Sequence, residues 1–296
     1  MAMTKEEIRA RAQGCIMLGQ LAGDSLGSLV EFQSPERILR SHPSGVRELA
    51  NGGTFDTLAG QPTDDSEMAL ALARTLVERR TYDPDAARAA YVDWLASGPF
   101  NCGNTISGAL RGHLNPDSQT NGAMMRISPL GIFGVNHSLE QVADWARQDA
   151  ALTHPHPVCV QANALYAMAI AWAIAEGPDP VDLYRQIVAW AEAMAVEDAL
   201  MAAVREAAHA PPEDYLTHMG WVLVAFRNAL WQLHQARPLE EAVVDTVMQG
   251  GDTDTNAAIC GALVGAVQGR QALPAQWTES VLNCRPESYS QIWCTQ

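Results

Sequence analysis

The chain has few basic residues for its size. Its 296 residues include 19 Lys and Arg against 34 Asp and Glu, so the formal net charge is −15 at pH 7 and the pI is near 4.8. A surface of this sign repels a phosphate backbone, and the balance therefore argues against a nucleic-acid partner. Divalent cations bound to clustered Asp side chains would offset part of the negative charge.

Cysteine and histidine patterns typical of zinc sites are absent. The cysteines, at positions 15, 102, 159, 260, 284 and 294, form no CxxC pair, and no His-x-x-x-His spacing occurs. Four of them stand in apolar or glycine-rich surroundings, as reduced and buried thiols do. A disulfide framework and a structural zinc site are therefore not indicated.

Long apolar runs are also missing from the sequence. The most apolar early window, residues 14–32, is interrupted by Gln20, Asp24 and Glu31, and no segment combines the length and the apolar continuity of a membrane span. The first residues resemble a polar helix start rather than a signal peptide. We expect a cytoplasmic protein without a membrane partner.

No convincing period-two alternation occurs, whereas almost every apolar stretch has a period near 3.6. We therefore predict an all-α fold: one domain over residues 1–296, of about a dozen helices and without a linker or a 20–50-residue repeat. The predicted helices cover 5–30, 66–80, 84–97, 103–112, 121–134, 139–149, 157–177, 180–195, 197–209, 215–235, 239–248, 255–269 and 274–283.

Two of these helices carry glycines at steps of four. A glycine stripe costs roughly 1 kcal/mol per residue against Ala and is tolerable where two backbones must approach closely. We expect the two helices to lie centrally, which makes them candidates for packing against each other. We expect Asp24, within the first stripe, to be a hydrogen-bonded structural carboxylate. The stripes are Gly19, Gly23 and Gly27, and Gly261, Gly265 and Gly269.

Acidic residues gather at the start of the second of these helices, in residues 250–256 (GGDTDTN). Asp, Thr and Asn at such a place can cap the first free N–H groups of a helix. Capping needs one acceptor, however, and this turn supplies Asp252, Asp254 and the hydroxyl group of Thr255. Hard oxygen ligands on one turn suit Mg²⁺, Mn²⁺ or Ca²⁺, so cap and metal site are both open on this stretch alone.

A second acidic cluster, in residues 61–67 (QPTDDSE), also leads into an apolar run. Asp64 and Glu67 have the offset of a capping box. Adjacent Asp64 and Asp65 cannot both be that cap, and like charges so close repel unless something positive lies between them. We therefore expect the two clusters to converge on a shared cation site, each supplying about half of the ligands.

Other polar stretches are individually weak. Residues 34–62 form a long glycine-punctuated connection of the kind that often closes over a site. Residues 97–105 and 121–126 place glycine and amide side chains at predicted helix starts, which favour anions but are also ordinary turn chemistry. His154 and His156, beside prolines, are more typical of capping or substrate contact than of a metal site.

Taken together, these stretches resemble the ADP-ribosylglycohydrolase family. Each motif alone is unspecific, but TDDS followed by GGDTDTN, in the family's order, is a strong combination, and the motifs span residues 14–269. They are residues 19–32 (GQLAGDSLGSLVEF), 63–66 (TDDS), 121–126 (NGAMMR), 153–154 (TH) and 250–256 (GGDTDTN).

The resemblance implies an all-α fold around two Mg²⁺ or Mn²⁺ ions. By position, the metal ligands would be Thr63, Asp64, Asp65, Asp252, Asp254 and Thr255. Glu31 would match the acidic residue of a mobile loop that gates the site or orients substrate and water. The residues around ADP-ribose would be Asn101, Gly103, Asn104, Asn121, Gly122, Met125, Arg126 and His154. Some relatives carry an acidic residue where this chain has the neutral Asn101, which leaves that contact open.

The implied reaction is hydrolysis of the bond between ADP-ribose and a modified protein side chain, arginine being the first expectation. Cleavage at the ribose carbon develops oxocarbenium character and needs activated water, which two metal ions can supply. Glu31, Asp65 and Asp252 are the candidate catalytic carboxylates, and helix starts with Arg126 would hold the diphosphate. The alternatives are an ADP-ribose-binding protein, an immunity protein that occludes an ADP-ribosyltransferase toxin, and a two-metal phosphoesterase.

Overall fold

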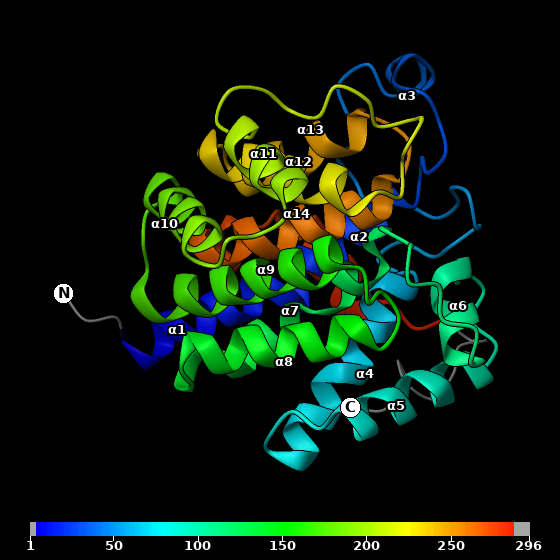
Figure 1. Ribbon diagram of the computed structural model, residues 1–296. Coiled ribbons are helices and arrows are strands. Elements are labelled where there is room, and N and C mark those ends of the chain that lie inside the picture. The colour runs from blue at the N-terminus through cyan, green and yellow to red at the C-terminus, as the bar shows by residue number, and fades with distance from the viewer. Residues whose placement is uncertain (1–3, 287–296) are drawn as a thin grey trace.

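Helices make up nearly all regular structure in the computed structural model, which describes residues 4–286 (Figure 1). Within this range the only β-type pairings are the isolated bridges Gly52–Thr57 and Thr120–Trp221. The buried apolar side chains form one large cluster, with a small satellite next to it. The prediction of an all-α fold is confirmed.

Most of the helices follow one another through short connections, and the two longest are residues 42–63 and 207–221. In chain order they are α1 (Lys5–Ala12), the π-helix η1 (Gln13–Gln20), α2 (Leu21–Gly27), α3 (Pro35–Ser41), α4 (Asp64–Arg79), α5 (Pro84–Ala96), α6 (Asn104–Leu110), the 3₁₀-helix η2 (Asn121–Arg126), α7 (Ser128–Phe133), η3 (Gly134–Asn136), α8 (Leu139–Ala151), α9 (Pro157–Glu176), α10 (Pro180–Ala193), α11 (Asp198–Glu206), α12 (Val222–His234), α13 (Leu239–Met248), α14 (Thr253–Gln268), η4 (Arg270–Ala272) and α15 (Ala275–Asn283).

Two predicted elements differ from the observed ones for local reasons. The connection 34–62 contains α3, because Ser34 accepts a hydrogen bond from Arg37 N and Pro35 occupies the first turn. The helix predicted for 215–235 begins only at Val222, because Asp214 Oδ1 accepts hydrogen bonds from the N–H groups of Leu216 and Thr217 and holds that segment in a turn.

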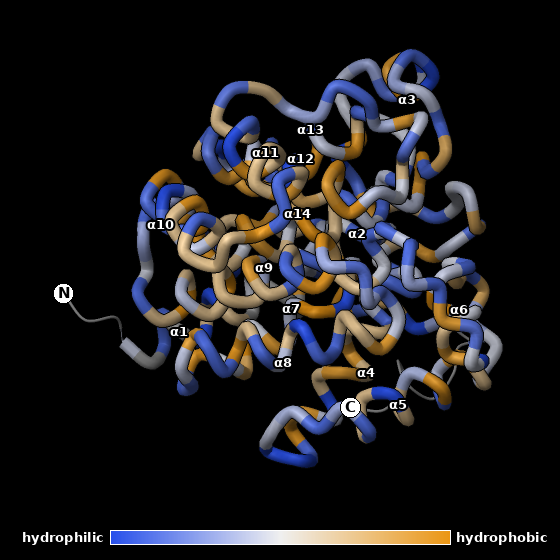
Figure 2. The backbone as a smooth tube through the Cα atoms, viewed as in Figure 1, coloured by the Kyte–Doolittle hydropathy of each residue, from blue (hydrophilic) through white to orange (hydrophobic). Residues whose placement is uncertain are grey.

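Helix α9 lies between α8 and α14 in the view of Figure 1, and most of its residues are buried. By length and composition alone it could cross a membrane, and 78% of its most apolar window is buried in the protein. The sequence-based statement that no segment has such length and apolar continuity is therefore wrong for α9. Burial identifies it as a core helix, in line with the concentration of hydrophobic residues in the inner helices in Figure 2.

The glycine stripes bring two helical segments into backbone contact, as the sequence predicts. A Cβ atom on Gly23 would lie 2.2 Å from the carbonyl oxygen of Ala257 in α14, and one on Gly27 would lie 2.3 Å from that of Thr253. The Thr253 hydroxyl group also donates to the Gly27 carbonyl oxygen at 2.7 Å. This close approach places the end of α2 beside the acidic start of α14.

Replacing Gly23 by alanine should therefore destabilise the protein. Helix propensity favours Ala over Gly by roughly 1 kcal/mol, but the added methyl group would overlap a backbone oxygen that cannot rotate away. We expect a net loss of at least about 2 kcal/mol in the free energy of unfolding, measured by urea denaturation. Gly108→Ala in α6, where the nearest atom is 3.3 Å away, is the matched control and should change stability far less. Equal stability of the two variants would refute the packing argument.

The connection between α3 and α4 is anchored at several points. Trp277 of α15 donates from Nε1 to the Arg47 carbonyl oxygen, and Gln276 pairs with the backbone of Leu49. None of residues 34–62 lines the cavity described below. Among the cysteines, Cys159 and Cys260 are buried thiols without a disulfide, whereas the Cys15 side chain and Cys294 lie outside the described part.

Candidate active site

One cavity collects residues from both acidic clusters. Its volume is about 320 Å³. The Asp64–Asp65 pair comes from the start of α4, and Asp252, Asp254 and Thr255 come from the start of α14. Segments nearly two hundred positions apart therefore meet at one site. The lining residues are Glu31, Phe32, Asp64, Asp65, Asn101, Gly103, Asn104, Thr105, Ile106, Thr120, Asn121, Gly122, Met125, His154, Met219, Gly220, Asp252, Asp254 and Thr255.

The N-cap residues of the two acidic helix starts do not cap through their side chains. Neither Thr63, before α4, nor Asp252, before α14, accepts a capping hydrogen bond through its side chain. By contrast, Asp83 caps α5 through its side chain. In the second cluster, Asp254 Oδ1 accepts a hydrogen bond from Thr255 N at 2.9 Å, so one of its oxygens serves the first turn of α14. Capping therefore does not account for the other carboxylates of the two clusters that line the cavity.

Asp24 of α2 supplies the cap that α4 lacks. Its carboxylate accepts hydrogen bonds from Thr63 N at 2.9 Å, from Ser66 N at 3.1 Å and from Ser66 Oγ at 2.6 Å. Burial nonetheless raises the Asp24 pKa to about 6. The prediction that Asp24 is a hydrogen-bonded structural carboxylate is confirmed, and its contribution is to leave Asp64 and Asp65 free.

The glycine pair before α14 places Glu31 in the site. Gly250 and Gly251 both have φ +74, and a Cβ atom there would lie 2.4 Å from the Gln33 carbonyl oxygen and 2.0 Å from that of Tyr215, respectively. Only glycine fits such a left-handed and crowded turn. Phe32 N donates to the Gly251 carbonyl oxygen at 2.8 Å, and Gly251 N donates to that of Gln33 at 3.0 Å. These bonds hold Glu31 next to Asp252.

Three carboxylates converge closely enough to share a cation. One oxygen each from Glu31, Asp252 and Asp254 lies within 4.8 Å of the others. Asp252 Oδ2 also accepts a hydrogen bond from Asn121 Nδ2 at 2.7 Å, and Thr63 Oγ1 donates to Asp65 Oδ2 at 2.9 Å.

The buried carboxylates of this cluster repel one another when no cation is bound between them. Among the residues that the structure describes, no Lys or Arg lines the cavity. Burial, followed by repulsion from Asp252, raises the Glu31 pKa to about 8, and burial followed by repulsion from Asp24 raises the Asp64 pKa to about 7. Burial is also the main cause that raises the pKa values of Asp65 and Asp254 well above the ordinary range.

The residues present fit divalent cations. Glu31 Oε2 and Asp65 Oδ1 are buried and have no hydrogen-bond partner among the described residues, although buried polar atoms are normally satisfied. The donors are hard carboxylate and hydroxyl oxygens, the type that Mg²⁺ and Mn²⁺ prefer. A positive ion at this place would give the orphaned oxygens a partner and remove the mutual repulsion.

The cation-free protein should lose stability as pH rises. The pKa values of Glu31 and Asp64 are higher in the folded than in the unfolded chain, so their stabilisation is full below about pH 4 and is lost as pH rises through about 7 to 8. We expect the melting temperature in EDTA to fall by at least about 5 °C between about pH 5 and pH 8.5. Mn²⁺ should restore it at the higher pH, and a scan unchanged by Mn²⁺ would contradict the site.

Most residues expected around the substrate also line this cavity. They are Asn101, Gly103, Asn104, Asn121, Gly122, Met125 and His154. Thr63 is fully buried, is not among the residues that line the cavity, and donates from Oγ1 to Asp65, which does line it. His156 caps α9, its Nδ1 accepting from Val158 N, and the carboxylate of Glu67 accepts a hydrogen bond from Trp94 Nε1 at 2.7 Å. The capping box that the Asp64–Glu67 spacing suggested is thus not formed.

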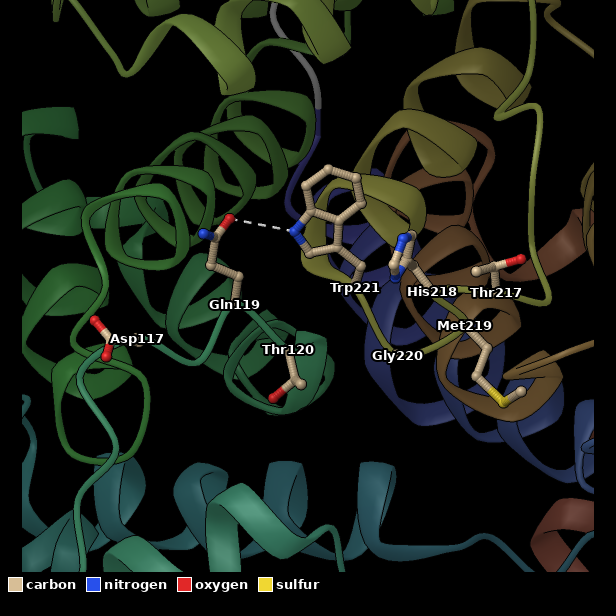
Figure 3. A pocket seen from close by; sticks show the side chains of 8 residues that line it. All are labelled: Asp117, Gln119, Thr120, Thr217, His218, Met219, Gly220 and Trp221. Atoms are coloured by element: carbon tan, nitrogen blue, oxygen red, sulfur yellow. Dashed lines mark hydrogen bonds between the residues drawn. The ribbon is translucent and has the colours of Figure 1, made fainter.

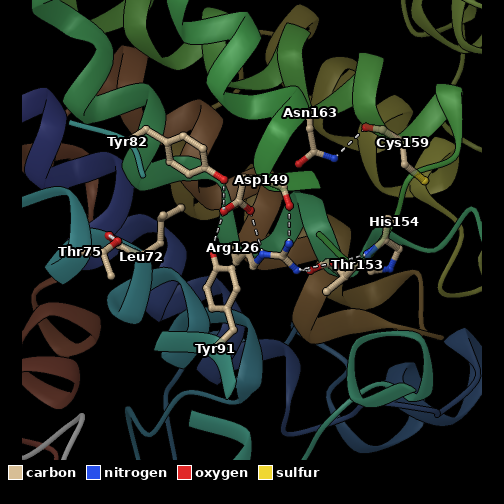
Figure 4. Close-up of polar contacts among 11 residues, drawn as sticks. Leu72, Thr75, Tyr82, Tyr91, Arg126, Asp149, Thr153, His154, Cys159 and Asn163 are labelled. Atoms are coloured by element: carbon tan, nitrogen blue, oxygen red, sulfur yellow. Dashed lines mark hydrogen bonds and ion pairs between the residues drawn. The ribbon is translucent and has the colours of Figure 1, made fainter. Parts of the chain in front are cut away.

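Arg126 is the exception, and the expectation that it holds the diphosphate is wrong. Its side chain is 0% exposed, does not line the cavity and forms an ion pair with Asp149, from Nε to Oδ1, at 3.0 Å (Figure 4). Nη1 donates to Thr153 Oγ1 and Nη2 to the Asp149 carbonyl oxygen, both at 2.9 Å. An apolar surrounding requires such a charge to be paired, and this pairing uses its donors within the protein.

Several cavity residues were not among the site residues predicted from the sequence. They are Phe32, Thr105, Ile106, Thr120, Met219 and Gly220. Backbone bonds bring the segment before α12 to the segment before η2, because Asn121 N donates to the Gly220 carbonyl oxygen and Val222 N to that of Gln119, each at 2.9 Å. The sequence near these residues does not predict this long-range pairing. The one hint is that Thr120 directly precedes Asn121, which was a predicted site residue.

A second hollow, of about 460 Å³, adjoins the first and shares Thr120, Met219 and Gly220 with it (Figure 3). Its wall includes Trp221, which is 37% exposed and donates from Nε1 to Gln119 Oε1 at 3.2 Å. The cavity therefore extends beyond the carboxylates, along a wall that contains the Trp221 ring. A hydrogen bond to Gln119 holds this ring in place.

In this all-α fold, one cavity is lined by carboxylates from two acidic helix starts. Such an arrangement suits an enzyme that hydrolyses its substrate with the help of divalent cations. The chain belongs to the ADP-ribosylglycohydrolase family, whose model matches residues 4–293. This membership confirms the resemblance read from the motifs and makes the chain an enzyme of ADP-ribosyl bond hydrolysis.

Relatives and a solved structure agree with this assignment. The chain is 27% identical over 286 residues to the ADP-ribosyl-[dinitrogen reductase] glycohydrolase of Rhodospirillum rubrum, covering 93% of this chain and 91% of the relative. It is 28% identical over 309 residues to ADP-ribosylarginine hydrolase Tri1 of Pseudomonas putida, covering 94% and 76%. A solved structure described as an ADP-ribosylglycohydrolase-related protein complex matches with a TM-score of 0.80 at 27% identity, covering 93% of each chain.

Proposed function

We propose that this chain uses two Mg²⁺ or Mn²⁺ ions to hydrolyse the N-glycosidic bond between ADP-ribose and an arginine side chain of a modified protein. The observation that carries the proposal is one cavity lined by buried carboxylates from two distant helix starts, with no Lys or Arg among its described lining residues. A relative named for ADP-ribosylarginine hydrolysis and another that acts on ADP-ribosyl-dinitrogen reductase support a protein substrate.

The proposed ligands of the two ions are those that the motifs indicate. When bound, divalent cations act as Lewis acids, fix oxygen ligands and lower the pKa of water. Glu31 also lies within reach of an ion held by Asp252 and Asp254, so its carboxylate can serve as a further ligand or as a proton acceptor. The proposed ligands are Thr63, Asp64, Asp65, Asp252, Asp254 and Thr255.

Hydrolysis moves one proton from the attacking water to the departing guanidine nitrogen. Glu31, Asp65 and Asp252 are the proposed catalytic carboxylates. Glu31 Oε2 and Asp65 Oδ1 have no hydrogen-bond partner among the described residues, so either oxygen can receive that proton. Asp252 is oriented by Asn121 Nδ2, which leaves its second oxygen for the reaction. The oxocarbenium character that develops at the ribose carbon is stabilised by this negative surrounding.

Neutral groups would hold the rest of ADP-ribose. Because no Lys or Arg lines the cavity, the diphosphate would depend on hydrogen-bond donors of the wall rather than on ion pairs. We assign the substrate contacts to Asn101, Gly103, Asn104, Asn121, Gly122, Met125 and His154.

The partner would be an ADP-ribosylated protein that presents a basic side chain. A net charge of −15 favours the approach of a cationic segment, which is the setting of a modified arginine. Asn101 is neutral where some relatives carry an acidic residue, so attraction for a cationic segment would have to come from the negative charge of the whole protein.

The test is a panel of defined ADP-ribosylated peptides, with arginine or serine linkage, incubated with Mg²⁺ or Mn²⁺ and analysed by mass spectrometry. We expect free ADP-ribose and unmodified arginine peptide, with loss of turnover in EDTA. AMP or phosphate as product would indicate a two-metal phosphoesterase. Binding of ADP-ribose, or of a transferase toxin, without turnover would indicate the sensor or immunity function. Undiminished turnover in EDTA would contradict the proposed cation dependence.

A further inference from the structure

A chain of buried polar side chains runs from Arg126 to the cavity wall. Arg126 Nη1 lies 2.9 Å from Thr153 Oγ1, and Thr153 Oγ1 lies 2.8 Å from His154 Nδ1. On the other side of the ring, His154 Nε2 lies 2.8 Å from Thr120 Oγ1. Figure 4 shows the first part of this chain, from Asp149 through Arg126 and Thr153 to His154. Thr120, at its far end, lines the cavity.

Arg126 fixes the direction of the first bond. A guanidinium group has only donors and keeps its charge in proteins, so Nη1 donates and Thr153 Oγ1 accepts. The hydroxyl proton of Thr153 must then find an acceptor elsewhere, and Thr153 is 0% exposed, so bulk water does not reach it. The one remaining acceptor within hydrogen-bond distance among the described residues is His154 Nδ1.

The direction of the first hydrogen bond also decides which nitrogen of the His154 ring carries the hydrogen. If Nδ1 carried the hydrogen instead, the buried Thr153 hydroxyl proton would have no acceptor, at a cost of about 1–3 kcal/mol. Nδ1 therefore accepts, and the ring hydrogen sits on Nε2. Burial, followed by the charge of Arg126, lowers the His154 pKa to about 3, so the ring is neutral and carries a single hydrogen.

The hydrogen bond between His154 and Thr120 leaves the hydroxyl proton of Thr120 free to be donated elsewhere. His154 Nε2–H donates to Thr120 Oγ1, so the hydroxyl hydrogen of Thr120 points away from the ring. Its neighbours within the protein are Ser118 Oγ at 3.3 Å and Thr105 Oγ1 at 3.4 Å, both long for hydroxyl pairs. An acceptor in the cavity at ordinary distance would be the better partner.

We propose that Arg126 is a positioning residue that acts through Thr153 and His154 to make the Thr120 hydroxyl a hydrogen-bond donor toward the cavity. The matching ligand group is an oxygen that only accepts, as in a phosphate, and we assign it to the diphosphate of the ADP-ribosyl substrate. This inference rests on the proposed function. Arg126, which does not line the cavity, thus contributes through the neutral side chains of Thr153, His154 and Thr120 instead of by direct contact.

The first test measures the affinity for ADP-ribose, with Mg²⁺ present, by isothermal titration calorimetry. Thr120→Val should raise the dissociation constant about tenfold, whereas Thr120→Ser, which keeps the hydroxyl group, should stay within about twofold. Thr75→Val removes a hydroxyl group of α4 that donates to the Leu72 carbonyl oxygen and does not line the cavity, and it should change affinity less than about threefold. Equal effects of Thr75→Val and Thr120→Val, or no effect of Thr120→Val, would overturn the inference.

The second test needs no substrate and separates this inference from the proposed function. Long-range ¹⁵N–¹H spectra report the tautomer of His154, whose signals are those missing in His154→Gln. We expect the Nε2–H tautomer in the unmodified chain and in Thr153→Ser, and its loss in Thr153→Val. An Nδ1–H tautomer in the unmodified chain would overturn the relay even if ADP-ribose binds. Failure of the unmodified chain to bind ADP-ribose would instead count against the proposed function.

Discussion

Replacing Asp254 by asparagine is expected to lower the rate of ADP-ribosyl bond hydrolysis at least about a thousandfold, because a cation-binding carboxylate supplies several kcal/mol of transition-state stabilisation and about 1.4 kcal/mol corresponds to a factor of ten. Asp254 is 1% exposed and lies within 4.8 Å, oxygen to oxygen, of Glu31 and Asp252. The other carboxylates of the site cannot replace the charge of Asp254, because they are themselves proposed to bind the cations.

Loss of folding cannot account for this effect. Burial and the Glu31 charge raise the Asp254 pKa well above its ordinary range, so a neutral amide should leave the cation-free protein at least as stable at pH 7. The measurement is single-turnover release of ADP-ribose, alongside a melting curve in EDTA. Asp182→Asn, which removes an exposed carboxylate paired with Arg185, is the matched control and should retain full activity. Activity of Asp254→Asn within tenfold of the unmodified chain would refute the role.

Arg126→Met should destabilise the protein by about 3–5 kcal/mol, because it leaves the carboxylate of Asp149 buried without its cation. Both side chains are 0% exposed. Tyr91 donates to Asp149 Oδ2 at 2.9 Å and Tyr82 to the same oxygen at 3.4 Å, and these neutral donors do not neutralise the charge. The Tyr91 ring, 4.6 Å from the guanidinium carbon, would also lose its cation contact.

The measurement is the free energy of unfolding from urea denaturation, with the m-value compared to detect a change in mechanism. Arg185→Met is the matched control, since it breaks an exposed pair with Asp182, and exposed pairs contribute about 0–1 kcal/mol. If both substitutions cost the same, the Arg126–Asp149 pair is not a structural element, and direct contact of Arg126 with substrate would have to be reconsidered.

Local patterns were sufficient to predict the helices and the acidic starts of α4 and α14. Apolar periodicity marks a helix wherever one face is buried, and the glycine steps at Gly19, Gly23 and Gly27 indicate close backbone contact. Two adjacent aspartates at a helix start exceed what capping requires, which is why the convergence of the two clusters could be expected from the sequence. The starting points of α3 and α12 depended on turn hydrogen bonds that periodicity does not register.

Partners from distant segments could not be predicted in this way. Asp24 caps a helix that begins forty positions later, and its sequence neighbours give no sign of this. Arg126 lies in a stretch that resembles a substrate-binding motif, yet its guanidinium group forms an ion pair with Asp149 from α8. Met219 and Gly220 reach the cavity through backbone bonds to residues 119–121. Such pairings are properties of the folded arrangement, because tertiary contact decides them.

Anomalous X-ray diffraction from crystals grown with Mn²⁺ tests the central claim most directly. The account predicts two manganese peaks within coordination distance of Asp64 or Asp65 on one side and of Asp252 or Asp254 on the other. Peaks that contact only one of the two helix starts, or that lie outside this cavity, would contradict it.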